Sequence, residues 1–244
     1  MTEYRRDRGA ARGAPADRPT AVVTGASRGI GRAIALRLAA DYDVVATARD
    51  ETALERLTAE IRAAGGRCRP LAVDLTRPDD VARALADVDA DALVNNAGVM
   101  HKKPFLELSP AEWHEMVDVN FNALYHVTRA VLPGMMARGR GHVIIIGSIT
   151  GRSAFAGGTC YAATKHAVMG FSESLLFEVR HSGVKVSVVM PGSVATDMAG
   201  AEADATWMLG AADVAEAVAH VLSTPPPVLV HRLEIRALKP PRKG

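Results

Sequence analysis

Short runs of apolar, often β-branched residues alternate with longer amphipathic segments from residue 20 onward. The run Val-Ile-Ile-Ile at 143–146 has no polar residue between its apolar ones, which is typical of a strand buried on both faces of a parallel sheet. The segments 30–39 and 53–64 instead place apolar residues at helical spacing. The predicted strands cover residues 21–24, 43–47, 69–73, 92–94, 142–146, 184–190 and 228–235.

This repetition of strand, helix and strand with short connections predicts right-handed crossovers and an α/β fold. We expect a single Rossmann-type domain with a doubly wound, mostly parallel sheet of about seven strands and helices on both faces. No linker rich in Pro and Gly interrupts residues 20–235, so one domain should span 19–244. Residues 1–18 lack apolar periodicity and are rich in Arg, Ala, Gly and Pro, which predicts a disordered tail.

Composition and charge argue against several classes of partner. The net charge of +2 is too small to indicate a nucleic acid or a membrane surface. No apolar run approaches the ~20 residues that a membrane span needs, and the N-terminus lacks the apolar segment of a secretory signal. The two cysteines, Cys68 and Cys160, form no CxxC pair and the histidines form no metal-binding pattern. We therefore expect no metal and a reducing, cytoplasmic location.

A glycine-rich turn joins the first predicted strand to the first predicted helix. Residues 24–31 read Thr-Gly-Ala-Ser-Arg-Gly-Ile-Gly. Glycines let the backbone approach a pyrophosphate closely, and the helix N-terminus that follows attracts an anion. The spacing GxxxGxG differs from the more usual GxGxxG, so a turn without a ligand stays an alternative. The expected contacts to a dinucleotide are Gly25, Ser27, Arg28, Gly29, Ile30 and Gly31.

The end of the second predicted strand bears on the choice of cofactor. An acidic residue there would bind the ribose of NAD, but this strand carries no carboxylate before Arg49. Arg28 should project toward the same region, and guanidinium groups pair well with phosphate. Asp50 competes with this interpretation, although residues 50–52 also fit a helix N-cap and first turn. The sequence therefore favours NADP(H) over NAD(H); the alternative is that both arginines are solvated surface charges.

Candidate catalytic residues follow the later predicted strands. They are the Asn-Asn-Ala-Gly motif at 95–98, Asn120 in a predicted helix, Ser148, and Tyr161 and Lys165 one helical turn apart. A carbonyl that accepts a hydride also needs a proton, and a free tyrosine has a pKa near ~10. A nearby ammonium such as Lys165 would lower that pKa, and Ser148 could hydrogen-bond the same oxygen. Each residue alone has an ordinary structural explanation, but together, at strand ends, they indicate a catalytic site.

In these motifs the chain resembles the short-chain dehydrogenase/reductase family, in the branch with a Tyr-x-x-x-Lys site, over residues 20–222. The resemblance implies an oxidoreductase that interconverts a carbonyl and a secondary alcohol on a small molecule, with Tyr161 as general acid/base. It implies that Lys165 tunes the tyrosine, Ser148 orients the carbonyl and Asn120 anchors a water in a proton relay. The further cofactor contacts that it implies are Asp74, Leu75, Asn96, Ala97, Gly98, Tyr161, Lys165, Pro191, Gly192, Val194 and Thr196.

The C-terminal region departs from the family pattern. Residues 199–209 are short for the family's substrate-covering segment, and 228–239 do not resemble the glycine-rich ending of the 3-oxoacyl-carrier-protein reductases. We therefore expect an open pocket and doubt an acyl-thioester substrate. Two alternatives remain, an epimerase or dehydratase that uses bound NAD internally, and a non-catalytic redox sensor or scaffold. The resemblance also implies a homodimer or homotetramer formed through helices at about 109–138 and 161–182.

Overall fold

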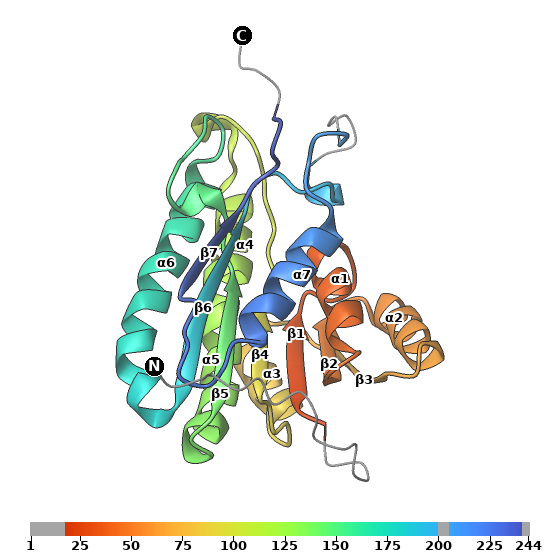
Figure 1. Cartoon of the computed structure of the whole chain (residues 1–244). Helices are drawn as coiled ribbons and strands as arrows, with labels where there is room; N and C mark the ends of the chain where they lie inside the picture. Colours follow the sequence, from red (N-terminus) through yellow and green to blue (C-terminus); the bar gives the residue numbers. More distant parts are fainter. Residues whose placement is uncertain (1–17, 200–204, 241–244) are drawn as a thin grey trace.

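The computed structural model describes residues 18–199 and 205–240, and one parallel sheet forms the centre of the described part (Figure 1). Its strands are β1 (Thr20–Thr24), β2 (Asp43–Ala48), β3 (Arg67–Ala72), β4 (Ala92–Asn95), β5 (Gly141–Ile146), β6 (Val184–Pro191) and β7 (Arg232–Ile235). They lie in the order β3-β2-β1-β4-β5-β6-β7, and every neighbouring pair is parallel. The α/β fold that the alternating pattern predicts is confirmed.

Helices cover both faces of the sheet, as Figure 1 shows. They are α1 (Gly29–Leu38), α2 (Glu51–Ala63), α3 (Pro78–Leu85), α4 (Pro110–Val117), α5 (Ala123–Ala137), α6 (Thr159–Val179) and α7 (Ala211–Leu222). Helices α1, α2 and α7 bury residues such as Ile34 and Val218 in one core cluster. Helices α3, α5 and α6 bury Val131 and Val168 in a second cluster on the other face. The central part of the sheet is therefore buried on both sides, which explains why strands such as β1 and β5 lack alternating polar residues, whereas the edge strands β3 and β7 retain them.

The strand order reverses beside β1, which pairs with β2 on one side and with β4 on the other. In open α/β sheets such a reversal leaves a crevice beyond the carboxyl ends of the strands. The chain crosses from β1 through α1 to β2, and it returns from β3 through α3 to β4. The turn after β1 and the loop after β4 therefore meet at this crevice.

Two helices begin with side-chain caps that the sequence contains. Asp50 accepts a hydrogen bond at 2.9 Å from the backbone N–H of Ala53, so it caps α2 as its N-cap interpretation predicts. Ser109 and Glu112 form a capping box at the start of α4. Both caps satisfy N–H groups that a helix end would otherwise leave without a partner.

Most predicted strands shift by one or two residues at one end or both, as in β3, and three larger features of the fold differ from the prediction. The last strand begins at Arg232 and not at 228, because the three prolines at 225–227 lack N–H donors and delay strand pairing. A π-helical turn, Asp118–Asn122, interrupts the single helix predicted for 109–138. Most of the predicted tail lies outside the described residues, but Arg18 donates a hydrogen bond to the Ala39 carbonyl at 2.8 Å and belongs to the domain. Across residues 18–199 and 205–240, no helix combines the length and apolar character that spanning a membrane requires.

Candidate active site

The parallel sheet brings the sequence motifs to one edge of the molecule. Strands β1, β4, β5 and β6 all end there, and each is followed by a motif that the sequence singles out. The remaining cofactor contacts expected from the sequence lie at or after strand ends at this edge, and they are Ser27, Ile30, Leu75, Ala97, Gly98, Pro191, Gly192 and Val194. The structure thus gathers residues that lie more than a hundred positions apart in the chain.

The glycine-rich turn after β1 has a backbone that only glycine tolerates. Gly25 and Gly29 have φ angles of 65° and 55°, in the left-handed region that side chains disfavour. A Cβ atom on Gly31 would overlap the carbonyl oxygen of Gly25. The turn therefore exposes main chain at the start of α1, where N–H groups without helical partners attract an anion.

Thr24 and Asn96 hold this turn against the loop after β4. The Thr24 hydroxyl accepts hydrogen bonds from the backbone N–H groups of Asn96 and Ala97 at 2.9 and 3.0 Å. The Asn96 side chain donates to the Thr24 carbonyl at 2.8 Å. Asn96 and Thr24 therefore stabilise the glycine turn, and Thr24 is not among the site residues that the sequence predicts. Its place as the first residue of the glycine motif, at a strand end, is the signal that could have identified it.

Charged residues surround the place where a dinucleotide's adenosine would lie, beyond β2 and β3. Burial raises the pKa of the Asp74 carboxyl, but hydrogen bonds from Thr76 and the charges of Arg49 and Arg77 lower it by more. Both Thr76 bonds, at 3.0 and 2.8 Å, reach the same oxygen, Oδ1. Asp74 is therefore a fixed anion, and Arg49 is an exposed cation close to it at the end of β2.

The loop after β6 lies over the glycine turn. A Cβ on Gly29 would sit 3.4 Å from the Thr196 methyl carbon, so the two segments are almost in contact. Arg28 approaches Asp197 with its Nη1 atom 3.3 Å from the carboxylate, and both side chains are about three-quarters exposed. The sequence predicts that Arg28 binds a cofactor phosphate, whereas in this structure Arg28 pairs with Asp197.

Asn120 connects three segments of the site from the π-helical turn Asp118–Asn122. Its amide oxygen accepts from the Val99 N–H at 2.8 Å, and its amide nitrogen donates to the Val99 carbonyl at 3.0 Å. The same nitrogen donates at 3.1 Å to the Thr164 hydroxyl, which donates to the Tyr161 carbonyl at 2.8 Å. Single π-helical turns occur often at functional sites, and here the turn directs a buried amide at both the β4 loop and α6.

Ser148 and Tyr161 meet where β5 and α6 approach one another. Ser148 follows β5, and its hydroxyl accepts from the Thr150 N–H at 3.1 Å. Tyr161 is half-buried in the first turn of α6. Burial raises the pKa of the Tyr161 phenol above its usual value, and the hydrogen bond with Ser148 opposes that rise without cancelling it.

Lys165 lies one turn further along α6 and is only 6% exposed. Its ammonium donates to the Ile146 carbonyl at 2.9 Å and lies 5.7 Å from the centre of the Tyr161 ring. Burial lowers the pKa of Lys165 to about 8. The sequence predicts that Lys165 lowers the pKa of Tyr161. In this structure burial is the largest influence on the Tyr161 phenol and raises its pKa, and the lowering by Lys165 together with an oxidised nicotinamide stays a prediction.

A small cavity of about 10 Å³ adjoins the catalytic candidates, which is close to the volume that one water molecule needs. Its polar lining comes from Thr24, Asn95, Asn120 and Lys165. Apolar residues of α5 and β5 form much of the remaining wall, and Leu75, Ala97, Val119 and Val168 complete it.

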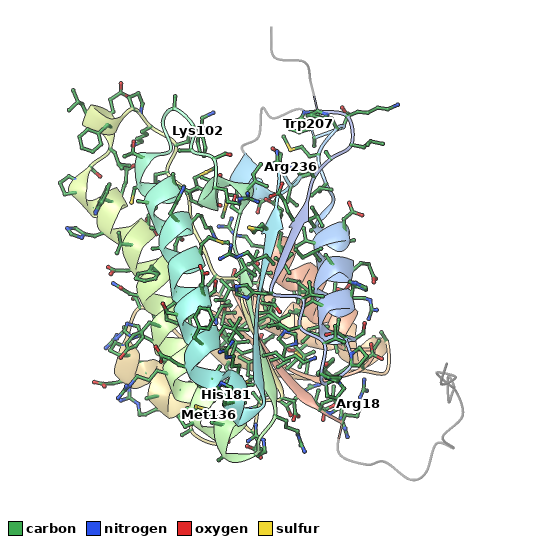
Figure 2. The ribbon with its side chains drawn as sticks, turned by 60° about the vertical axis from the view of Figure 1, so that its left-hand side comes forward. Arg18, Lys102, Met136, His181, Trp207 and Arg236 are labelled. Carbon is green, nitrogen blue, oxygen red and sulfur yellow. The ribbon has the colours of Figure 1, made fainter. Side chains whose placement is uncertain are left out.

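Two further loops flank the catalytic candidates. The backbone N–H of Lys103 donates to the Gly157 carbonyl at 3.0 Å, which joins the loop after β4 to the loop before α6. In Figure 2 the labelled Lys102, Trp207 and Arg236 lie at the same end of the molecule. The predicted short covering segment, 199–209, lies in part outside the described residues.

Comparison with known proteins identifies the family. A family model described as short chain dehydrogenase matches residues 19–207. The chain is 36% identical over 220 residues to 3-oxoacyl-(acyl-carrier-protein) reductase FabG of Escherichia coli strain K12, covering 83% of this chain and 89% of the relative. A metagenomic short-chain oxidoreductase in complex with NADP is 37% identical with a TM-score of 0.78, covering 88% of this chain and 96% of that one.

The closed form of a serine dehydrogenase complexed with NADP+ is 33% identical to this chain, with a TM-score of 0.86. The match covers 92% of this chain and 97% of that structure. The family model's match, residues 19–207, includes the glycine turn and the segments that carry Asn120, Ser148, Tyr161 and Lys165. The protein belongs to the short-chain dehydrogenase family and is an oxidoreductase, as its motifs predict.

Proposed function

We propose that this protein interconverts a carbonyl and a secondary alcohol on a small molecule, with NADP(H) as cofactor and Tyr161 as general acid/base. The observation that carries the proposal is the meeting of Ser148, Tyr161 and Lys165 at the carboxyl edge of the sheet, beside a glycine turn. An epimerase or dehydratase that uses bound NAD internally remains the alternative chemistry.

The residues around the crevice fit NADP(H). The glycine turn offers main-chain N–H groups to a pyrophosphate, since side chains are excluded at Gly25 and Gly31. Asp74 keeps one carboxylate oxygen free of Thr76 and can accept from an adenine amino group. Arg49 is exposed beside it and suits a 2′-phosphate, and relatives of this fold carry NADP. When bound, NADP(H) supplies or accepts the hydride.

The protein's own residues handle the proton. Because burial raises the pKa of Tyr161, the phenol is protonated at neutral pH and can donate to a carbonyl oxygen that gains negative charge. Ser148 is a neighbour of the phenol and can hydrogen-bond the same oxygen. A water in the cavity between Asn120 and Lys165 would connect the site to a source of protons.

The test is the oxidation of NADPH and of NADH against a panel of ketones, aldehydes, quinones and 3-oxoacyl thioesters. We expect turnover of at least one carbonyl with NADPH, and slower turnover with NADH. Binding of NADPH without turnover of any member would contradict the proposed reaction for these classes of carbonyl. Isotope exchange within a substrate without net oxidation of cofactor would favour the epimerase.

Replacement of Arg49 by Asp tests the choice of cofactor. The change removes a cation that faces a 2′-phosphate and introduces repulsion, and a hydrogen bond to a charged group contributes about 1.5–3 kcal/mol. We expect the ratio of kcat/KM with NADPH to that with NADH to fall about 10- to 100-fold. Arg56→Asp makes the same charge change on the exposed side of α2 and should leave this ratio unchanged. An equal ratio in the Arg49 variant and the wild type would contradict the assignment.

We also propose that the protein forms a homodimer or homotetramer in the cytoplasm. Tyr125 on α5 and Phe177 on α6 are 47% and 56% exposed, which gives these two helices apolar outer surfaces suited to a second copy. The buried thiols of Cys68 and Cys160 agree with a reducing compartment. A monomeric mass by light scattering would contradict the oligomer.

A further inference from the structure

The edge strand β7 carries a row of charged side chains on the face that α6 covers. Alternate residues of a strand share a face, so Arg232 and Glu234 point the same way, and Arg236 directly follows the strand. Arg232 pairs with Glu173 of α6 at 2.8 Å, which identifies that face. Further along the strand, Glu234 binds Arg236 at 2.5 Å and approaches Arg152 at 3.6 Å.

The two arginines that share Glu234 stand at the catalytic edge. Arg152 lies four residues after Ser148 in the sequence and directly follows the turn Ile149–Gly151. Arg236 follows β7, and a Cβ on Gly192 would lie 3.7 Å from the Arg236 Cγ atom. Gly192 follows the end of β6, so Arg236 lies beside the loop after β6, and Arg152 lies beside the turn that follows Ser148. In Figure 2 Arg236 lies at the end of the molecule that also carries Lys102 and Trp207.

The charges of this cluster do not balance. One carboxylate faces two guanidinium groups, which leaves a net positive charge at Arg152, Glu234 and Arg236. The side chains of Arg152 and Arg236 are 66% and 57% exposed, whereas that of Glu234 is 29% exposed. Each guanidinium therefore keeps N–H donors directed at solvent while the carboxylate holds it in place. Arginine donors fixed in this way suit the paired oxygens of an anion.

Strand stability alone does not explain this arrangement. Arg232 and Glu173 already join β7 to α6 with a balanced pair of one cation and one anion. One arginine would be enough to neutralise Glu234, but two arginines, Arg152 and Arg236, pair with it. The extra positive charge lies at the catalytic end of the strand.

We propose that Arg152 and Arg236 form an anion-binding edge of the substrate site, so that the preferred substrate is an oxo or hydroxy compound that bears a carboxylate or phosphate group. The proposal rests on the proposed function and adds the substrate class to it. Glu234 holds both arginines in position and competes with the substrate for their donors. The anionic group binds at the ends of β6 and β7 while the carbonyl faces Ser148 and Tyr161.

The experiment compares matched pairs of substrates in the wild type with NADPH. The pairs are short-chain oxo acids with their methyl esters, and dihydroxyacetone phosphate with dihydroxyacetone. We expect kcat/KM to be at least about tenfold higher for the anionic member of one pair, with the difference in KM. The pair that shows the preference distinguishes carboxylate from phosphate. Equal values within every pair, with the neutral members turned over, would overturn the anion site and leave the proposed function intact. No turnover of any pair or of the wider panel would overturn both the anion site and the proposed function.

Variants test whether the preference for anionic substrates depends on Arg152 and Arg236. In Arg152→Leu and Arg236→Leu the anionic-to-neutral ratio of kcat/KM should fall about tenfold, through KM. Glu234→Gln should lower KM for the anion, because it removes the competing carboxylate. Arg232→Leu, at the other end of the same strand, should leave the ratio unchanged. Thermal unfolding shows whether each variant is folded. A ratio that persists in both folded arginine variants, or that falls equally in Arg232→Leu, would overturn the proposal.

Discussion

Replacing Tyr161 with phenylalanine is expected to abolish carbonyl reduction while NADPH binding stays within about tenfold of the wild type. The change removes one hydroxyl and keeps the ring that packs at the start of α6. General acid catalysis by a positioned side chain contributes roughly 10²–10⁴-fold to a rate, and Tyr161 is the proposed proton donor. A single lost hydrogen bond to the cofactor costs about 0.5–1.5 kcal/mol, which limits the effect on binding. Steady-state oxidation of NADPH and a fluorescence titration of NADPH measure the two quantities.

Tyr125→Phe is the matched control for this variant. Tyr125 lies on α5 with its side chain exposed, and its ring stacks edge-on with His126 at a centroid distance of 5.5 Å. It should retain wild-type turnover and NADPH affinity. If Tyr161→Phe kept turnover comparable to that of Tyr125→Phe, another group would have to supply the proton. If it lost turnover only because NADPH no longer bound, the tyrosine would be a binding residue and not the acid.

The sheet and the meeting of the motifs are predictable from the sequence because both follow from the topology of parallel strands. Apolar runs such as 143–146 identify strands, and parallel strands joined by helices place all their carboxyl ends at one edge. Residues after β1, β4, β5 and β6 must then lie near one another whatever the details of packing. This reasoning locates Ser148 beside Tyr161 without any knowledge of distances.

Features that depend on local hydrogen bonds are not predictable in the same way. Nothing in the periodicity of residues 109–138 signals the π-helical turn that directs Asn120 at Val99 and Thr164, since one inserted residue changes the apolar pattern only slightly. The sequence marks Thr24 by its place at the start of the glycine motif, but the hydrogen bonds that it accepts are known only once the loop after β4 is placed against it.

Exposed charges are a third case. The sequence treats Arg28 and Arg49 as equivalent candidates for a phosphate, but only the structure shows that Arg28 has Asp197 within reach. Such an exposed pair contributes little to stability, so cofactor binding can displace it at small cost. The positions of these two cations can therefore be predicted from the sequence, whereas their ion-pair partners cannot.

The charge state of Lys165 makes a further prediction, in which activity and stability respond differently. Lys165→Met should lower kcat at least about hundredfold, because the ammonium beside Tyr161 is lost. The wild-type lysine is buried and has its pKa lowered to about 8. Between that value and 10.5 the unfolded chain binds more protons than the folded one, so the free energy of unfolding of the wild type rises with pH.

Lys165→Met should lack this rise. The difference in the free energy of unfolding between the two proteins therefore separates the contribution of Lys165 from that of the other titrating groups. The free energy of unfolding of the wild type, relative to the variant, should increase by about 2 kcal/mol between about pH 7 and pH 9.5. Urea unfolding at both pH values measures the difference. Lys102→Met removes an exposed lysine from the loop after β4 and should show no such change with pH. A difference between wild type and Lys165→Met that stays constant over this range would mean that the buried ammonium keeps an ordinary affinity for its proton. The hydrogen bond to the Ile146 carbonyl would then offset the cost of burial, and Lys165 would act on Tyr161 as a permanent cation.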